Sequence, residues 1–280
     1  MSAPIPAIDS HQHFWNYSAE EYGWIHDGMA ALRRGFTAAD LHREMVEANV
    51  EGAVTVQARQ TLEETRWLLQ VAEEHPYIVG VVGWAPLADA DVEDSLSELA
   101  PRRKLKGLRH IVQDEPDDEF LLRADFNAGV SRLSRHGLAY DILVYERHLP
   151  YAIEFADRHT DMVFVLDHIA KPRIGDRALE PWRTRILELS ERENVYCKIS
   201  GMVTEADWAG WKEADLRPFY EVVLDAFGPR RLMFGSDWPV LLAAGSYGEW
   251  AGMVRRWIGT LTATEQERIL RGTAIEAYKL

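Results

Sequence analysis

Short β-rich runs alternate with amphipathic helical stretches along the whole of this 280-residue chain. Several runs are continuous strings of Val, Ile and Leu, which is typical of parallel strands buried on both faces. Eight such runs predict an α/β fold, a (β/α)8 TIM barrel, with a doubly wound open sheet as the alternative. No Gly-x-Gly-x-x-Gly follows the first run, which disfavours the dinucleotide-binding form of that alternative. The expected strands are residues 7–9, 53–57, 78–84, 106–109, 138–143, 162–167, 195–199 and 232–235.

Local signals mark the ends of the helices between these strands. Thr37 is expected to cap one helix, and Thr61 with Glu64 forms a capping-box pattern for the next. Pro181 suits the first turn of a later helix, and Gly228 follows the end of another apolar stripe. No linker rich in Ser and Gly divides the chain, so we expect a single barrel domain over residues 1–280.

The balance of charged residues limits the partners of the protein. The chain has 31 Lys and Arg against 45 Asp and Glu, a formal net charge of −14. This balance disfavours nucleic acid and anionic membrane surfaces, because both attract basic proteins. The longest apolar run, residues 77–87, is too short to cross a bilayer. A small anionic molecule is still compatible, since a few arginines in a cleft set the local field.

The cysteine content and the N-terminus suggest a location. Cys197 is the only cysteine, so no disulfide can form within the chain, and we expect the reducing cytoplasm. Residues 1–6 have neither the basic nor the apolar segment of a signal peptide. A monomer and a homodimer are both compatible with the sequence.

Three connections are unusually long, and each follows an expected strand. They span residues 10–35, 200–215 and 236–248. All three would gather at the C-terminal face of a barrel, where barrel enzymes carry their active sites. Their tryptophans either line a pocket or have a structural role, in which they cap the barrel or pack on a neighbouring subunit. Trp24 is our candidate among them for contact with a substrate.

Histidines and an aspartate occur at the ends of three expected strands. His11 and His13 lie two residues apart on the first strand and therefore point the same way. His168 follows the sixth strand and Asp237 follows the eighth. Each residue alone could be a buried histidine bonded to backbone or a turn cap. Their joint placement at one rim predicts a site for zero or one divalent cation, with Zn²⁺ the best match to three imidazoles and a carboxylate.

Other polar residues end neighbouring strands. The planar guanidinium of Arg109 suits a carboxylate or a ring oxygen of a substrate, although an ion pair with one of the many carboxylates is an equal alternative. Gln57 could donate to a substrate hydroxyl or satisfy backbone groups. Lys198 lies within the seventh strand, and its direction depends on register. Our candidate substrate-binding residues are Arg109, His110, Gln57 and Trp24.

Five segments taken together resemble the amidohydrolase superfamily. They are most similar to its sugar-lactonase branch, the L-fuconolactonase and L-rhamnonolactonase type, with 2-pyrone-4,6-dicarboxylate lactonase as a relative. The ordered set is specific, although each motif alone is weak. The segments are residues 9–15 (DSHQHFW), 107–110 (GLRH), 166–172 (LDHIAKP), 197–201 (CKISG) and 234–239 (FGSDWP).

The resemblance implies a distorted (β/α)8 barrel that hydrolyses a lactone ring. It implies that His11, His13 and His168 surround the substrate carbonyl or a metal ion. It also implies that Asp237 takes a proton from the attacking water and that Arg109 contacts the substrate. Binuclear members carry a carboxylated lysine where this chain has Arg109 and a histidine at the end of the fifth strand, which here has none. A two-metal centre is therefore not expected.

Two other functions are open at this point. One is a metal-dependent decarboxylase of the same superfamily, acting on an aromatic or muconate-like acid. The other is a non-catalytic barrel that binds a sugar acid, which the acidic surface and the aromatic loops permit. A barrel that only binds a sugar would not need a cluster of ionisable side chains around one mouth. We therefore expect a hydrolase of carbohydrate catabolism that opens a sugar (aldono) lactone, such as L-fuconolactone or L-rhamnonolactone, by Asp-activated water.

Overall fold

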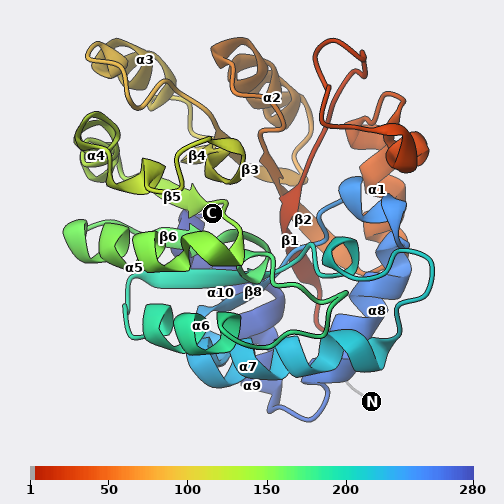
Figure 1. The fold of residues 1–280 in the computed structure, drawn as a ribbon. Coiled ribbons are helices and arrows are strands. Elements are labelled where there is room, and N and C mark those ends of the chain that lie inside the picture. Colours follow the sequence, from red (N-terminus) through yellow and green to blue (C-terminus); the bar gives the residue numbers. More distant parts are fainter. Residues whose placement is uncertain (1–3) are drawn as a thin grey trace.

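A computed structural model describes residues 4–280 and contains one eight-stranded sheet, in which parallel strands follow one another in chain order (Figure 1). All eight expected strands and the (β/α)8 barrel are confirmed. Of the N-terminal residues 1–6 considered above for a signal peptide, residues 1–3 lie outside the described residues. The strands are β1 (Ala7–Gln12), β2 (Val50–Val56), β3 (Ile78–Gly83), β4 (Leu105–His110), β5 (Ala139–Ile142), β6 (Phe164–Leu166), β7 (Val195–Ile199) and β8 (Leu232–Phe234).

Helices surround the sheet because parallel strands need crossover connections, and each helix buries an apolar face against the strands. Within residues 4–280, no helix combines the length and the apolar character needed to cross a membrane. The helices are α1 (Ala38–Glu47), α2 (Leu62–Glu74), α3 (Val92–Leu99), α4 (Ala124–Val130), α5 (Leu149–Arg158), α6 (Trp182–Ser190), α7 (Glu213–Arg231), α8 (Tyr247–Ile258), α9 (Ala263–Glu267) and α10 (Thr273–Tyr278).

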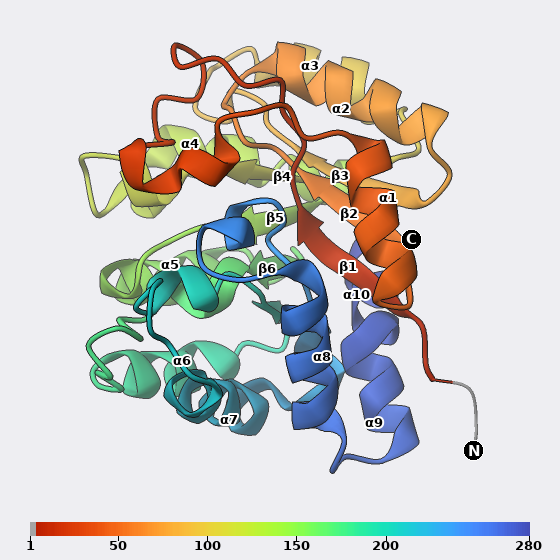
Figure 2. The ribbon, with the colours of Figure 1, turned by 90° about the vertical axis from the view of Figure 1, so that its right-hand side faces the viewer.

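The ring of strands closes irregularly between β1 and β8. In the described part of the chain no strand ladder joins this pair, and a single bridge links Gln12 to Trp238. Beside it, the amide of His13 donates to the carbonyl of Trp238 (2.7 Å), and the amide of Asp237 donates to the carbonyl of His11 (2.8 Å). Helices α1 and α8 lie side by side outside this seam (Figures 1 and 2). The barrel is therefore distorted at the place where the first and last strands meet.

A buried carboxylate braces the same seam. Oδ1 of Asp9 accepts a hydrogen bond from the amide of Ser236 (2.8 Å), and Oδ2 accepts from the hydroxyls of Ser236 (2.6 Å) and Tyr247 (3.0 Å). Burial raises the pKa of Asp9 to about 6, and these hydrogen bonds limit the rise. Asp9 thus ties β1 to the loop after β8 and to α8.

The helix starts agree with the sequence in part. Thr37 caps α1 as expected. At α2, Oγ1 of Thr61 accepts from the amide of Glu64 (3.1 Å). The other hydrogen bond of the expected capping box, from the amide of Thr61 to the side chain of Glu64, is a wrong prediction. Oε2 of Glu64 instead accepts from the amides of Ala58 (3.0 Å) and Arg59 (2.7 Å), which the loop after β2 leaves without strand partners. Glu64 therefore fixes a loop at the barrel mouth.

We expect Glu64→Gln to flatten the pH dependence of stability. Burial raises the pKa of Glu64 to about 7 from its ordinary 4.5. The folded chain then holds a proton that the unfolded chain has lost, so stability is greatest below pH 4.5 and falls as the pH rises to 7. The contribution of Glu64 to this fall is about 3 kcal/mol.

Urea unfolding of wild type and Glu64→Gln at acidic and neutral pH measures this difference. Glu63→Gln, an exposed neighbour on the same helix, serves as the matched control and should behave like the wild type. An unchanged pH dependence in Glu64→Gln would show that Glu64 does not hold the extra proton.

Candidate active site

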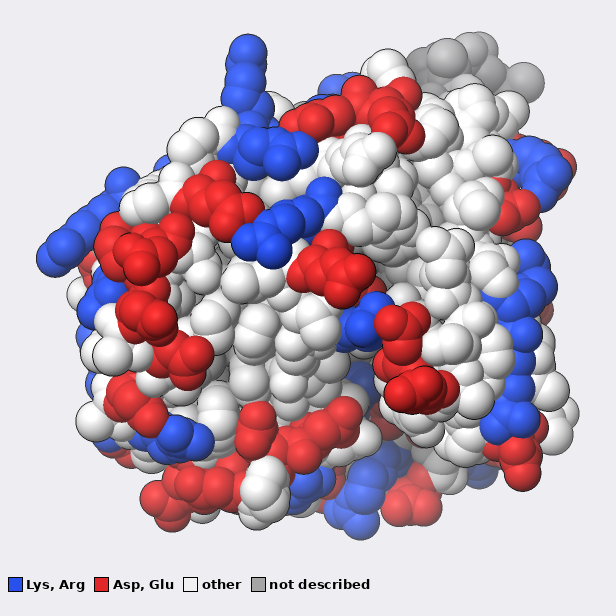
Figure 3. Space-filling model, turned by 90° about the horizontal axis from the view of Figure 1, so that it is seen from above, with Lys and Arg blue, Asp and Glu red and all other residues white. Residues whose placement is uncertain are grey.

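A cavity of about 390 Å³ opens at the C-terminal ends of the strands. Its wall includes His13, Arg109, His168 and Asp237, which follow or end four different strands, and Trp24 from the long connection after β1. This is the end at which barrel enzymes carry their sites. Around the face seen in Figure 3, acidic and basic side chains are interspersed and no single basic patch dominates.

Three imidazoles and one carboxylate converge at this cavity. Nε2 of His11 lies 3.1 Å from Nε2 of His13. Oδ1 of Asp237 lies 3.3 Å from His13 Nε2, 3.8 Å from His11 Nε2 and 3.9 Å from His168 Nε2. All four residues are buried. The structure thus brings together the four residues that the sequence placed at one rim.

Backbone conformation aims these side chains. Alternation along β1 directs His11 and His13 to the same side. His168, two positions past the end of β6, and Asp237, three positions past the end of β8, have φ of 51° and 61°, in the left-handed region. Gly201 passes so close to His168 that a Cβ there would lie 2.5 Å from the imidazole Nδ1. Gly201 is therefore needed to make room for the imidazole, a role that its place in a sequence motif did not reveal.

The surroundings favour neutral imidazoles at His11 and His168 beside an ionised carboxylate at Asp237. Burial lowers the pKa of His168 to about 4 and lowers the pKa of His11 well below its ordinary value. Burial alone would raise the pKa of Asp237. The charge interaction with His168 and a hydrogen bond with His13 outweigh burial and hold the pKa of Asp237 below its ordinary value.

This donor set fits one zinc-sized ion. Zinc bonds of about 2.0–2.1 Å in a tetrahedral site place neighbouring donor atoms about 3.3–3.4 Å apart. The donor atoms of His11, His13 and Asp237 form one such group, at separations of 3.1, 3.3 and 3.8 Å, whereas His168 groups with His11 and Asp167 instead. Nδ1 of His13 donates to the carbonyl of Val56 (2.8 Å), which leaves Nε2 with the lone pair that a ligand needs. Small side-chain movements would therefore let His11, His13 and Asp237 hold one ion, and a larger movement would be needed for His168 to join them.

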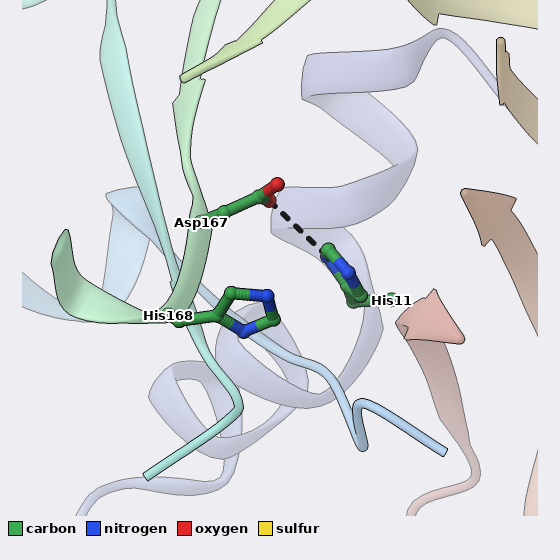
Figure 4. A group of neighbouring side chains, drawn as sticks. All are labelled: His11, Asp167 and His168. Atoms are coloured by element: carbon green, nitrogen blue, oxygen red, sulfur yellow. Dashed lines mark hydrogen bonds and ion pairs between the residues drawn. The ribbon is translucent and has the colours of Figure 1, made fainter. Parts of the chain in front are cut away.

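Directly behind the cluster lies a network of buried charges. Nζ of Lys198 lies 2.5 Å from Asp141 Oδ2, 2.9 Å from Asp167 Oδ1 and 3.1 Å from His11 Nδ1. Arg109 Nη1 donates to Asp167 Oδ2 (2.9 Å). Against the effect of burial, Lys198, His11 and Arg109 hold the pKa of Asp167 well below its ordinary value. Figure 4 shows His168 beside the His11–Asp167 pair, whose Nδ1 and Oδ1 are 3.2 Å apart.

The network answers two questions left by the sequence. Lys198 points into the barrel, and Arg109 both pairs with a carboxylate and reaches the cavity wall. Sequence reasoning missed Asp141 and Tyr278, whose hydroxyl donates to Asp141 Oδ2 (2.8 Å). Charged residues such as Asp141 and Lys198 inside otherwise apolar strands are the signal that could have found this network, because buried charges need partners.

His110, a candidate for substrate binding, lies away from the cavity. Its Nε2 is 2.6 Å from Oε1 of Glu115, its Nδ1 accepts from Trp84 (3.3 Å), and its ring stacks on Phe120. Successive strand residues face opposite sides, so His110 points outward where Arg109 points inward. The expected contact between His110 and a substrate is corrected on this ground.

Of the other two substrate-binding candidates, one supports the cavity wall from behind and the other lines the cavity. Gln57 is fully buried and donates to the backbone carbonyl of Arg109 (3.3 Å), so it lies behind the cavity wall. Trp24 lines the cavity and is 37% exposed. Trp208 also lines it, stacked on His26 with ring centroids 5.9 Å apart. Of the roles considered for the tryptophans, Trp24 and Trp208 therefore have that of lining the pocket.

Comparisons with known proteins agree with this geometry. A family model for amidohydrolases matches residues 8–280. A curated L-fucono-1,5-lactonase of Burkholderia multivorans is 44% identical, covering 98% of this chain and 96% of its own length. Another from Burkholderia ambifaria is 35% identical, covering 98% and 95%. A crystal structure of an amidohydrolase from Burkholderia multivorans with bound zinc has a TM-score of 0.94 at 43% identity, covering 98% of this chain and 99% of that one.

Lys198→Met is expected to destabilise the fold strongly. Removing the ammonium leaves the carboxylates of Asp141 and Asp167 buried without their shared cation, and breaking a buried ion pair from one side costs about 3–5 kcal/mol. Urea unfolding at neutral pH measures the loss. The double variant Lys198→Met/Asp141→Asn should recover part of it, because one of the stranded charges is gone. A loss below 1 kcal/mol in the single variant would contradict this account.

Proposed function

The chain belongs to the amidohydrolase family, and on this premise we propose that it hydrolyses the ring ester of a sugar (aldono) lactone. Two relatives that are 44% and 35% identical over nearly their full length are L-fucono-1,5-lactonases, which supports this substrate class. The observation that carries the proposal is the convergence of Asp237 with His13 and His168 in the wall of one cavity, with His11 buried directly behind them.

In this proposal Asp237 is the general base. Its Oδ1 faces the imidazoles, and the side chain lines the cavity. A water in the cavity beside Asp237 can lose its proton to the carboxylate while its oxygen attacks the lactone carbonyl carbon. The protonated Asp237 then delivers the proton to the departing ring oxygen. The product is the open-chain hydroxy acid.

The remaining polar groups stabilise charge that develops during attack. The carbonyl oxygen becomes an oxyanion beside the guanidinium of Arg109, which lines the same cavity. The imidazole of His168 also lines it and can donate there when its Nε2 holds no ion. Fixed donors and cations in a site with little water are the largest source of rate acceleration in acyl transfer. Arg109 is held for this task by Asp167, which pairs with its Nη1 (2.9 Å).

A divalent cation held by His11, His13, His168 and Asp237 would supply Lewis-acid polarisation of the carbonyl. The donor distances support an ion of the size of zinc. The zinc in the Burkholderia multivorans amidohydrolase supports the same choice. We propose zinc as the resident ion.

We further propose that the protein works in the cytoplasm as one domain, as a monomer or a homodimer. The thiol of Cys197 is fully buried, and burial raises its pKa, which suits a structural thiol with no redox role. Cell fractionation and size-exclusion chromatography with light scattering test the location and the assembly.

Asp237→Asn should lower kcat for L-fucono-1,5-lactone by about 10²–10⁴, the usual contribution of a general base. Substrate binding should change much less, because the amide keeps the size of the carboxyl group. A pH-indicator assay measures turnover. Asp176→Asn, at an exposed surface position, is the control and should match wild type. Near-normal turnover in Asp237→Asn would refute the role of Asp237 as the base.

Zinc content tests the metal site without relying on activity. Protein loaded with zinc chloride and then desalted should retain one ion per chain by metal analysis. His13→Ala should retain little, because it removes one donor from the set. His26→Ala, which changes a cavity histidine outside the set, should bind zinc like wild type. Equal zinc in wild type and His13→Ala would contradict the ligand assignment.

A further inference from the structure

The segment from His168 to Lys171 forms a left-handed turn, and the mechanism above uses only its first residue. The φ angles are 51° at His168, 49° at Ile169, 62° at Ala170 and 47° at Lys171. The amide of Lys171 donates to the carbonyl of His168 (2.8 Å) and closes the turn. Left-handed conformation costs an L-residue about 1–2 kcal/mol, so four in succession are a considerable strain. Such strain persists at functional sites where the surroundings hold it in place.

This turn directs two polar side chains into one cavity. Residues three apart in a turn closed by a bond from residue i to residue i+3 project on the same side. His168 and Lys171 both line the cavity, whereas Ile169 and Ala170 between them are fully buried. The strained backbone therefore delivers an ammonium group to the cavity next to the imidazole.

Lys171 has a loosely held partner in the cavity wall. Its Nζ lies 3.9 Å from Oε1 of Glu205 and 5.6 Å from the ring centroid of Tyr145. An ammonium–carboxylate hydrogen bond is about 2.7–2.9 Å long. At 3.9 Å, Lys171 and Glu205 each keep the capacity to hydrogen-bond to a further group. By contrast, Arg109 and Asp167 behind the site are in full contact at 2.9 Å.

Glu205 is held in place by its backbone. Its carbonyl accepts from the amide of Gly175 (2.9 Å), and its neighbour Thr204 donates through Oγ1 to the carbonyl of Gly201 (2.8 Å). The pair of Lys171 and Glu205 is thus built on two anchored segments. A ligand group would find the ammonium and the carboxylate already in position.

The spacing of this pair suits one kind of ligand group. A hydroxyl can accept a hydrogen bond from the ammonium of Lys171 and donate one to the carboxylate of Glu205 at the same time. A ligand carboxylate could satisfy only the ammonium and would meet two like charges, since Asp114 also lines the cavity. An alkyl group would leave both ions unsatisfied.

We propose that Lys171 and Glu205 form a hydroxyl-binding subsite that makes the enzyme select polyhydroxylated lactones over unsubstituted and carboxylated ones. This inference rests on the proposed lactonase function and identifies the residues that would set its specificity. The face of the Tyr145 ring adds an apolar surface beside the same subsite.

The test compares L-fucono-1,5-lactone with δ-valerolactone, which has the same ring size and no hydroxyls. Lys171→Met and Glu205→Gln should each lower kcat/KM for the sugar lactone about 10- to 100-fold, the value of one hydrogen bond to a charged group, chiefly through KM. Both variants should leave kcat/KM for δ-valerolactone within about twofold of wild type. Arg173→Met removes a nearby exposed charge that pairs with Glu146 and should change neither substrate.

Other outcomes would overturn the subsite. Equal losses on both lactones would assign Lys171 to the reacting carbonyl or to folding, and unchanged selectivity would remove the pair from recognition. If Lys171→Met folds poorly by its melting temperature, Lys171→Gly replaces it, because glycine adopts a φ of 47° without strain.

If wild type opens neither lactone, the proposed function fails by itself. Calorimetric affinity for the sugar lactone then tests the subsite without turnover. A weaker affinity in Lys171→Met and Glu205→Gln would support it, and an affinity equal to wild type would overturn it.

Discussion

The sharing of one buried carboxylate by two cations and an imidazole constrains the interior of this barrel. Asp167 contacts Lys198, Arg109 and His11, which come from three other strands. A charge removed from water is tolerated only with close partners, so the register that aims these side chains inward is fixed by the need to keep them together. The catalytic cluster lies directly above this network, and His11 belongs to both.

The sequence predicts the barrel because its strands are short apolar runs separated by well-marked helices. It also predicts the site, because residues that follow parallel strands meet at one end of a barrel whatever their distance along the chain. His11, His13, His168 and Asp237 needed only that topological argument. The side on which a residue lies is harder to predict, since His110 requires the register of β4.

Residues that depend on irregular backbone could not be inferred from periodicity. Lys171 reaches the cavity through a left-handed turn, and no pattern of alternation describes such a turn. Gly201 matters for the space that it leaves beside His168, which only a folded structure defines. Glu64 has the spacing of a helix cap but bonds to a loop, because the unpaired amides of Ala58 and Arg59 compete for its carboxylate.

The irregular closure between β1 and β8 has a consequence for how the protein would lose activity on warming. Most neighbouring strands are joined by several backbone bonds. Among the described residues, this pair meets through one bridge, a few loop contacts, the Asp9 brace and a hydrogen bond from the hydroxyl of Ser10 to the carbonyl of Phe234 (2.7 Å). Local opening favours the boundary with the fewest backbone bonds. The imidazoles of His11 and His13 lie on one edge of this boundary and Asp237 on the other. Partial opening there would separate base from imidazoles, so thermal inactivation would precede the cooperative loss of secondary structure.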